Sequence, residues 1–420
     1  MKLDVFLKGH KSLLKNFSYI TAMQFFILLA PLITYPYLVR VLGQELYGIV
    51  LSAQMLASYA SIIIDFGSNG VCAKHVSMNR NDKNKVSEIV NSVFIVRLVL
   101  LLSSFFLYMA VVFLVPQYRE FWILFALTYG LTLNDLLFPQ YYFQGIEHMK
   151  TITMISIITK LLFIGLVFFV VRSPEDYLLV PVLYTMGFAL GGIISIYIIY
   201  KRHKLKLFIP NYATIKFYIK DCSPLFANDL VCTVKDKLNY MFVGIFAGMS
   251  DVVIYDLGLK LHSLLTKPMQ ILTTVLLPRF AVSRNVSQLK KVIVLSFSIA
   301  FILVIVTNIF LPEIVEFFIH KKIDLLPLRA FLIAPLLVSV SSVISSNLFI
   351  AFGYNKYVLY SIIVTTVAYI LMFLFLLLSG RLNSIYAFVA LALLSYFTEF
   401  LYRLLKAKQI IKKETNHNIV

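Results

Sequence analysis

Charged side chains recur at helical spacing within one apolar stretch in the second half of the sequence. Asp256, Lys260, Ser263, Lys267 and Thr274 fall on a stripe about 60° wide when plotted on a helix. A lysine or aspartate at the centre of a membrane helix costs about 2.5–3.5 kcal/mol on insertion scales, so such residues usually face a cavity or a partner. We predict that this stripe lines a water-filled cavity, with Asp256 and Lys260 as an i,i+4 pair. In the alternative, these two lie near the interface and extend outward, which leaves only Lys267 deep.

A second group of charges lies in the preceding apolar stretch. Asp229 and Asp236 share a helix face, whereas Lys235, Asp236 and Lys237 are consecutive and must point in different directions. The functional interpretation is a cationic cavity wall with Asp236 as a counter-charge. The structural alternative is an ion pair that joins this helix to the next one. Because lysine ammonium groups suit phosphates and carboxylates, a cavity lined by them would attract anions.

Isolated charges elsewhere complete the set of candidate site residues. Arg97 and Lys160 are predicted to be cavity cations, although Lys160 could instead extend to a membrane edge. Asp65 could pair with Lys74 or Lys267. The candidate substrate-binding residues are therefore Lys235, Lys237, Lys260, Lys267, Arg97 and Lys160, and the candidate coupling residues or counter-charges are Asp229, Asp236, Asp256, Asp65 and Asp135.

The composition identifies the elements that must hold these charges. The 420 residues are 60% apolar and 14% charged, with a mean hydropathy of +0.87, whereas soluble domains average about 45–50% apolar and about 25% charged. A soluble enzyme and a disordered chain are therefore excluded. Apolar runs of about 20 residues predict membrane helices. We predict an all-α membrane protein with twelve transmembrane helices, near residues 17–39, 46–66, 89–115, 119–143, 151–171, 178–200, 222–247, 252–278, 291–318, 325–350, 357–379 and 384–405.

The distribution of positive charge predicts the orientation. With twelve spans both termini lie on one side, which carries 25 of the 38 Lys and Arg residues, against six on the other side. The positive-inside rule places both termini in the cytoplasm, and the membrane accounts for the net charge of +18 without nucleic acid. A basic loop at 201–220 separates an N-terminal bundle, 1–200, from a C-terminal bundle, 221–420. No cleavage pattern follows the basic N-terminal segment, so the first helix is expected to be retained.

The two halves share features at a nearly constant offset. Gly43 in the first outward loop corresponds to Gly248, 205 residues later. The turn from Gly145 to Lys150 corresponds to the turn from Gly353 to Lys356, 206–208 residues later. Six helices in each half make the repeats parallel, related by an axis along the membrane normal. This predicts two six-helix bundles that face each other across a cavity, with transport by rocking of one bundle against the other.

Motifs for catalysis or cofactor binding are missing from the sequence. There is no GxxxxGK[ST], HExxH or GxSxG pattern, and the three cysteines and seven histidines show no ligand spacing. We expect no enzyme activity, no cofactor and no metal. Aromatic residues such as Tyr141 and Tyr142 are expected at the membrane interface.

Several segments together resemble one transporter family. Residues 142–150, with the sequence YFQGIEHMK, are similar to the WFFQGIExMK pattern of O-antigen flippases of the Wzx type, in the polysaccharide biosynthesis/export family. Residues 42–48 and 64–67 resemble the first two helices of that family, and Asp236-Lys237 with the segment from Asp251 to Tyr255 resembles the opening of its second half. Tyr replaces the family's usual Trp at 141 or 142, and Ser250-Asp251 departs from its acidic-Val-Gly pattern.

The resemblance implies a fold, a substrate and a location. The fold would be MATE-like, in the multidrug/oligosaccharidyl-lipid/polysaccharide (MOP) exporter superfamily. The substrate would be an undecaprenyl-diphosphate-linked oligosaccharide, moved from the cytoplasmic to the periplasmic leaflet of the bacterial inner membrane. Membrane lipids and other O-antigen assembly proteins would be the partners.

Two other functions are weighed against this one. A cation-coupled multidrug antiporter of the same superfamily favours carboxylates in the first bundle, and residues 21–39 contain none. A membrane polysaccharide polymerase or ligase would be expected to place catalytic groups in a large outward loop, and every predicted outward loop is short.

Overall fold

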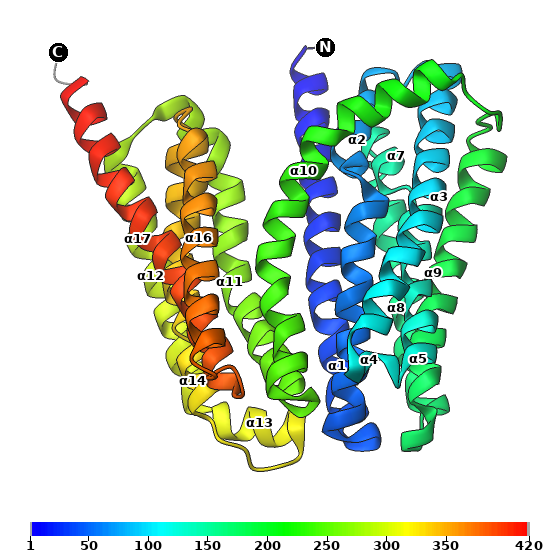
Figure 1. The fold of residues 1–420 in the computed structure, drawn as a ribbon. Coiled ribbons are helices and arrows are strands. Elements are labelled where there is room, and N and C mark those ends of the chain that lie inside the picture. The colour runs from blue at the N-terminus through cyan, green and yellow to red at the C-terminus, as the bar shows by residue number, and fades with distance from the viewer. Residues whose placement is uncertain (1, 418–420) are drawn as a thin grey trace. The chain divides into compact units, whose positions relative to one another are not determined.

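The protein is all-helical in this computed structural model (Figure 1). The structure describes the backbone of residues 2–417 and the side chains of all of these except 2–22, 25, 27, 228, 231–236, 278 and 413–417. The chain divides into two compact units, residues 1–237 (unit 1) and 238–420 (unit 2).

The first unit contains the longest helix of the chain and several short ones. Its elements are α1 (Lys2–Asp65), α2 (Ser68–Met78), α3 (Lys83–Leu114), α4 (Pro116–Arg119), α5 (Trp122–Tyr129), η1 (Gly130–Thr132), α6 (Leu133–Leu137), α7 (Gln140–Gly145), α8 (Met149–Val170), η2 (Pro174–Leu178), α9 (Leu179–Tyr197), η3 (Ile198–Arg202) and the larger part of α10 (Tyr212–Phe242).

The second unit begins within α10 and continues with long helices. Its further elements are η4 (Val243–Ala247), α11 (Met249–Ser283), α12 (Val286–Ile309), α13 (Leu311–Ile319), α14 (Leu326–Phe331), α15 (Ala334–Val343), η5 (Ile344–Ile350), α16 (Lys356–Leu378) and α17 (Ile385–His417).

Nine helical segments within the described part of the chain are long and apolar enough to cross a membrane. One of them, Leu28–Met78, covers two of the spans predicted from the sequence. The spans predicted at 222–247 and 252–278 fall on α10 with η4 and on α11, which are rich in charged residues and are not among the nine. All twelve predicted spans thus overlie helices, and the protein is a multi-pass membrane protein.

Two glycines with left-handed φ values separate long helical segments. Gly43 interrupts α1 with φ 78° and ψ 164°, and Gly248 separates η4 from α11 with φ 115° and ψ 160°. Such values are accessible to glycine and strained for other residues. A 64-residue helix would extend about 96 Å, three times the hydrocarbon thickness, if it were straight. Figure 1 shows instead that the chain reverses direction within α1.

Two predicted spans are interrupted in the structure. The span at 119–143 ends its helical course at Leu137, and Phe138 and Pro139 precede α7. Pro139 offers no backbone N–H, and proline disfavours helical φ and ψ at the preceding residue, so the break falls there. The span at 291–318 corresponds to α12 and the separate α13, which begins with a Leu-Pro pair and crosses the end of its unit in Figure 1.

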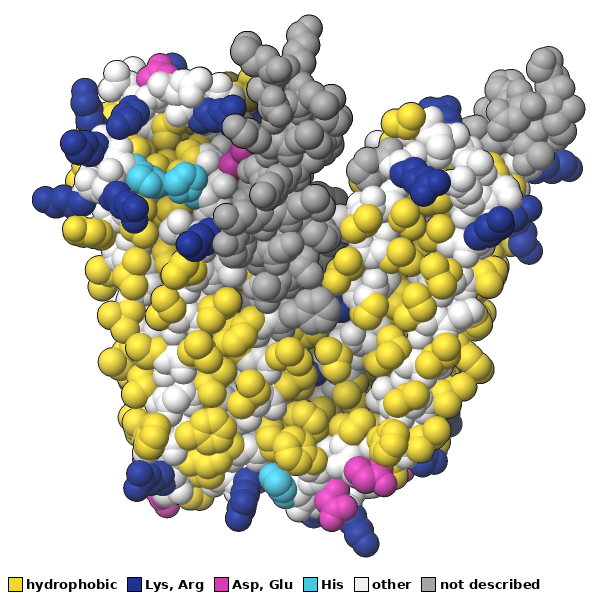
Figure 2. Space-filling view, turned by 180° about the vertical axis from the view of Figure 1, so that it is seen from behind, with side chains coloured by type: hydrophobic (Ala, Val, Ile, Leu, Met, Phe, Trp, Pro, Cys, Tyr) yellow, Lys and Arg dark blue, Asp and Glu magenta, His cyan; other side chains and the backbone are white. Residues whose placement is uncertain are grey.

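Apolar side chains cover the outside of the helices as well as filling the interior. Phe106, Leu114, Phe169 and Leu378 are more than two-thirds exposed, while Val76, Phe143 and Phe349 are buried in the cores of the two units. Figure 2 shows a band of apolar side chains on both units, with Lys and Arg at the two ends of the helices. This surface suits a lipid environment, in which close packing rather than water exclusion holds the helices together.

Candidate functional site

A left-handed turn between α1 and α2 gathers polar groups around an arginine of α3. Phe66 and Gly67 have φ values of 49° and 69°, so α1 ends at Asp65 and α2 begins at Ser68 in a new direction. A Cβ atom at Gly67 would lie only 2.8 Å from the backbone nitrogen of Phe226 on α10. The turn therefore requires glycine both for its backbone conformation and for the close approach of α10.

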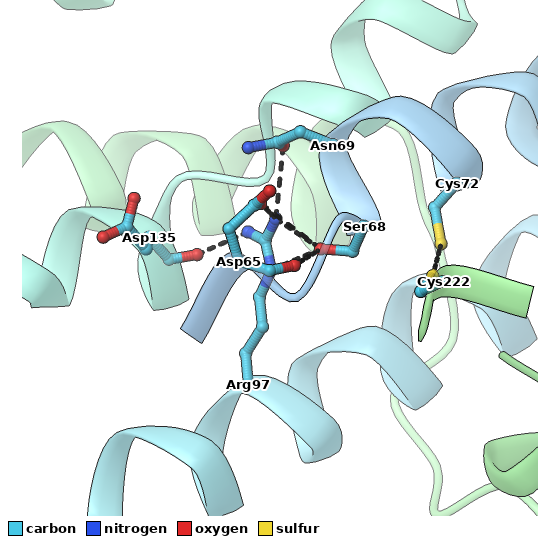
Figure 3. Close-up of polar contacts among 7 residues, drawn as sticks. All are labelled: Asp65, Ser68, Asn69, Cys72, Arg97, Asp135 and Cys222. Atoms are coloured by element: carbon cyan, nitrogen blue, oxygen red, sulfur yellow. Dashed lines mark hydrogen bonds and ion pairs between the residues drawn. The ribbon is translucent and has the colours of Figure 1, made fainter. Parts of the chain in front are cut away.

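Arg97 on α3 is the centre of this polar cluster, and its side chain is almost completely buried (Figure 3). Its Nη2 donates to Asp65 Oδ1 at 2.5 Å and to Asn69 Oδ1 at 3.2 Å. Its Nε donates to Ser68 Oγ at 2.9 Å, and its Nη1 donates to the backbone carbonyl of Asp135. Four residues from three helices thus accept hydrogen bonds from the guanidinium. We call Arg97 and these four residues the Arg97 cluster.

Further charges predicted from the sequence lie near the same cluster in unit 1. Lys237 Nζ donates to Ser58 Oγ on α1 at 2.8 Å. The Asp135 carboxylate lies within electrostatic range of Lys237, and Asp65 lies within range of Asp229. The structure therefore brings five predicted residues together here: Asp65, Arg97, Asp135, Asp229 and Lys237.

Two expectations for this region are wrong. Asp65 pairs with Arg97 rather than with Lys74 or Lys267, because the turn at Gly67 points its carboxylate toward α3. Tyr141 is buried rather than interfacial, and its ring lies against the Arg97 guanidinium, 5.2 Å from ring centroid to Cζ. Tyr142 is also buried.

In unit 2 the predicted pair on α11 is confirmed. Lys260 Nζ forms an ion pair with Asp256 Oδ2 one helical turn away. The Tyr240 hydroxyl also donates to Asp256 Oδ1 at 3.2 Å. Both charged side chains are largely buried, so the pair lies against the protein rather than extending away from it.

The remainder of the α11 stripe is more exposed. Lys267 is partly buried, and it forms no hydrogen bond or ion pair with any residue whose side chain is described. Ser263 and Thr274 on the same stripe are exposed. Lys160 on α8 resembles Lys267, since it is partly buried and has no hydrogen-bonding or ionic partner among the described residues. The side chains of Lys235 and Asp236 lie outside the described residues.

The structure also places buried polar groups that the sequence did not single out. Asn239 donates from Nδ2 to the Tyr255 hydroxyl at 2.6 Å and to the backbone carbonyl of Phe388 at 2.8 Å, and Tyr369 donates to its Oδ1 at 3.3 Å. These partners lie on α11, α16 and α17, so Asn239 links α10 to three other helices of unit 2. The spacing of residues along α10 does not predict that Asn239 makes these contacts.

Arg403 is a second buried cation, and the sequence did not single it out. It lies on α17. It pairs with Glu399 and donates to Ser361 Oγ and Ser341 Oγ, each at 3.1 Å. The i,i+4 spacing of Glu399 and Arg403 was the available signal.

Sequence comparisons identify relatives over most of the chain. A profile of the family described as polysaccharide biosynthesis protein matches residues 13–283. A protein of Escherichia coli (strain K12), named as a candidate O-antigen transporter, is 24% identical over 353 residues, which cover 82% of this chain and 85% of that protein. A protein of the same name from Shigella dysenteriae is 24% identical over 339 residues, covering 78% and 84%.

Solved structures with a similar fold are transporters of the MOP superfamily. An inward-facing multidrug resistance MATE family transporter aligns with a TM-score of 0.66 at 15% identity, covering 92% of this chain and 99% of that one. A MOP superfamily transporter from Pyrococcus furiosus aligns with a TM-score of 0.61 at 12% identity, covering 94% and 93%. At these identities the likeness establishes the fold, and the predicted MATE-like fold is confirmed.

Proposed function

The chain belongs to the polysaccharide biosynthesis protein family, and on that premise we propose that it flips a lipid-linked oligosaccharide across the membrane. The substrate is an O-antigen unit on undecaprenyl diphosphate, and it moves from the cytoplasmic to the periplasmic leaflet. The relatives named as O-antigen transporters and the transporter fold support this assignment. The two termini lie in the cytoplasm, on the side that carries most of the Lys and Arg.

The observation that carries the proposal is the polar stripe on α11. Lys267 lies between the buried Asp256–Lys260 pair and the exposed Thr274, within a unit whose other outward side chains are largely apolar. Lys267 has a half-buried ammonium group without a bonded partner in the described part of the chain. Such a group costs free energy when it contacts lipid and is stabilised when it contacts water or an anion. Lys267 is thus available for a diphosphate or an acidic sugar, whereas Lys260 is already neutralised by Asp256.

In unit 1, Lys237 and Lys160 are the corresponding candidate substrate contacts. Lys237 bonds to a serine hydroxyl, and Lys160 has no bonded partner among the described side chains. Arg97 has a different role in this proposal, because its donors are already used by the Arg97 cluster. It positions the end of α1 and the carboxyl groups of Asp65 and Asp135, which are candidates for counter-charge or coupling to a cation.

Matching turns support the proposed repeat of two six-helix bundles. Glu147 and Gly353 both have left-handed φ values, 61° and 85°. The N–H groups of the residues that follow, His148 and Tyr354, donate to the carbonyls five residues earlier, at 2.8 and 2.6 Å. These are Schellman-type helix ends at the same offset of 206 residues as Lys150 and Lys356. With the Gly43 and Gly248 breaks, they favour twelve crossings and alternating access by the two bundles.

A cation-coupled antiporter of the same superfamily is the second candidate function. The partly buried carboxylates of Asp65 and Asp135 in unit 1 favour it, because such groups can bind a cation at membrane depth. Pairing of Asp65 with Arg97 counts against a free carboxylate at that position. An antiporter would extrude a cationic drug and would leave the distribution of lipid-linked oligosaccharide unchanged.

A leaflet-resolved assay separates these functions. Cells that lack the chain should accumulate lipid-linked oligosaccharide in the cytoplasmic leaflet, and the wild-type chain should restore its exposure at the periplasmic face. Lys267→Ala should abolish most of the restoration and Lys267→Arg should retain part of it, since the charge remains. Lys290→Ala is the matched control, because this lysine of the same unit is exposed on α12. Full activity of a variant with alanine at 235, 237, 260 and 267 would overturn the proposed role of the lysines.

A further inference from the structure

A cationic pocket of about 330 Å³ lies at one end of unit 1, and none of its lining residues belongs to the α11 stripe. Arg80 and Lys83 flank the turn between α2 and α3, His148 lies at the start of α8, and Arg202 and His203 follow α9. Figure 2 shows histidine side chains among Lys and Arg at one end of the apolar surface. The pocket therefore gathers three permanent cations and two histidines from three chain segments.

The charges around this pocket are not balanced within unit 1. Glu147, next to His148, pairs with Arg80 at 3.2 Å, and both side chains are more than half exposed. The His203 ring is hydrogen-bonded through Nδ1 to the Tyr142 hydroxyl at 2.7 Å. Partial burial, together with His148, Arg202 and Lys83, holds the pKa of His203 below its ordinary value. The residues around His203 thus disfavour a further positive charge in the pocket. An anion-binding site whose anion is absent has this property.

A separate apolar pocket of about 230 Å³ is lined by residues of the same elements. On α3, Val86 lines the cationic pocket, and Val90, about 6 Å further along the helix, lines the apolar one. After α9 the corresponding pair is Leu205 and Leu207. The other lining residues are mostly apolar and include Phe94, Leu136, Leu137, Pro139, Ile196 and Ile199, while Arg97, Tyr141 and Tyr200 are the polar members.

We propose that unit 1 binds a phosphate-headed lipid at this place, with the phosphate among the cations and a hydrocarbon chain in the apolar pocket. Basic pockets between membrane helices favour anionic headgroups, and arginine binds phosphate oxygens in pairs. A soluble anion would leave the apolar pocket unused, and a neutral lipid would leave the cations unbalanced. The source of this chemistry is a glycerophospholipid or a polyprenyl phosphate. The site stands whether or not the chain flips an oligosaccharide.

The test uses the purified full chain in nanodiscs of phosphatidylcholine. The probes are phosphatidylglycerol, geranylgeranyl monophosphate, uncharged geranylgeraniol and inorganic pyrophosphate, and bound ligand is measured by native mass spectrometry and by titration. Lys83→Ala/Arg202→Ala should weaken binding of the phosphate lipids about twenty-five-fold, because each surface cation contributes about a fivefold gain. Ile196→Trp should fill the apolar pocket and weaken the same lipids without changing the charge.

Control variants and outcomes separate the possible results. Lys290→Ala/Lys291→Ala removes two exposed cations from unit 2 and should leave binding unchanged. The thermal melts of the lysine and arginine variants should match that of the wild type, since the altered side chains are exposed. Tight binding of either phosphate lipid, lost in both pocket variants, supports the site, and the preferred lipid identifies its source. Three results would each overturn the site. In the first, pyrophosphate binds as tightly as the phosphate lipids and Ile196→Trp has no effect. In the second, the unit 2 control loses as much affinity as the pocket variant, and in the third no phosphate lipid binds.

Discussion

Removal of the Arg97 guanidinium should destabilise unit 1 more than removal of any exposed cation on the same helix. Arg97→Ala leaves the Asp65 carboxylate without its ionic partner and removes donors from Ser68, Asn69 and the Asp135 carbonyl. Breaking a buried pair by removing one partner costs about 3–5 kcal/mol. The Asp65 side chain is 23% exposed, so water reaches it and the cost should lie near the lower end, about 3 kcal/mol.

Two matched variants make the comparison quantitative. Asp65→Asn keeps the shape and an amide oxygen that can accept from Nη2, so it should cost only about 1–2 kcal/mol. Lys85→Ala on α3 breaks an exposed pair with Glu88, in which the lysine is 58% exposed, and should cost about 0–1 kcal/mol. Because Arg97 and Asp65 are bonded to each other, the Arg97→Ala/Asp65→Asn double variant should cost less than the sum of the single variants.

Unfolding of the purified chain by SDS in mixed micelles measures these differences. Trp122, the single tryptophan of the chain, lies on α5 in unit 1, so its fluorescence reports on this unit separately from helical circular dichroism. The expected order of unfolding free energies is wild type, Lys85→Ala, Asp65→Asn, then Arg97→Ala. An Arg97→Ala variant within about 1 kcal/mol of the wild type would refute the reasoning that the Arg97 cluster stabilises unit 1.

Three further predictions concern other parts of unit 1. Lowering the pH from 7.5 to 5.5 should strengthen phosphate-lipid binding, because bound phosphate favours the protonated His203 whose pKa is otherwise lowered by burial and neighbouring cations; His203→Gln should flatten this dependence in the same titration. The lowered pKa of His203 has the opposite effect on folding stability when no lipid is bound. The free energy of unfolding should be highest above about pH 6.5 and should fall as the pH is lowered further, because protonation of His203 then favours the unfolded chain. The Cys72 and Cys222 sulfurs lie 3.9 Å apart, so mild oxidation in a Cys232→Ser background should cross-link α2 to α10, seen as a mass loss of two hydrogens in a peptide map; failure to form the bond would contradict this packing. Gly67→Ala should lower the thermal melting temperature, since left-handed φ costs a side chain about 1–2 kcal/mol and its Cβ would collide with α10 backbone; an unchanged melt would refute the requirement for glycine.

Local features of the fold were accessible from the sequence. The positions of the helices follow from runs of apolar residues, and the pair of Asp256 with Lys260 follows from i,i+4 spacing within one helix. The breaks at Gly43 and Gly248 follow from glycine in polar connections between apolar runs. These features depend on neighbours within about one helical turn, so periodicity and residue type carry the information.

The arrangement of the charges required the tertiary structure. Asp65 and Arg97 are 32 residues apart, and Ser58 and Lys237 are 179 apart. For Asp65 the sequence offered Lys74 or Lys267 as partners. The partner was decided by the left-handed turn at Gly67, which rotates the end of α1 toward α3. A helix presents charges on a face, but that face gains its partners only when other helices pack against it.

The cationic pocket of unit 1 likewise depends partly on sequence and partly on tertiary structure. Its positive charge is visible in the sequence as scattered basic residues next to predicted helix ends, at 80–83, 148 and 202–203. These residues converge on one pocket, with an apolar pocket beside it, only after α3, α7 and α9 come together. The sequence by itself determined that the chain enters a membrane and where its helices run, because these depend on transfer of each segment from water to lipid. Which charges neutralise one another and which remain available for a ligand was decided by helix packing, because electrostatic energy depends on distances between segments far apart in the chain.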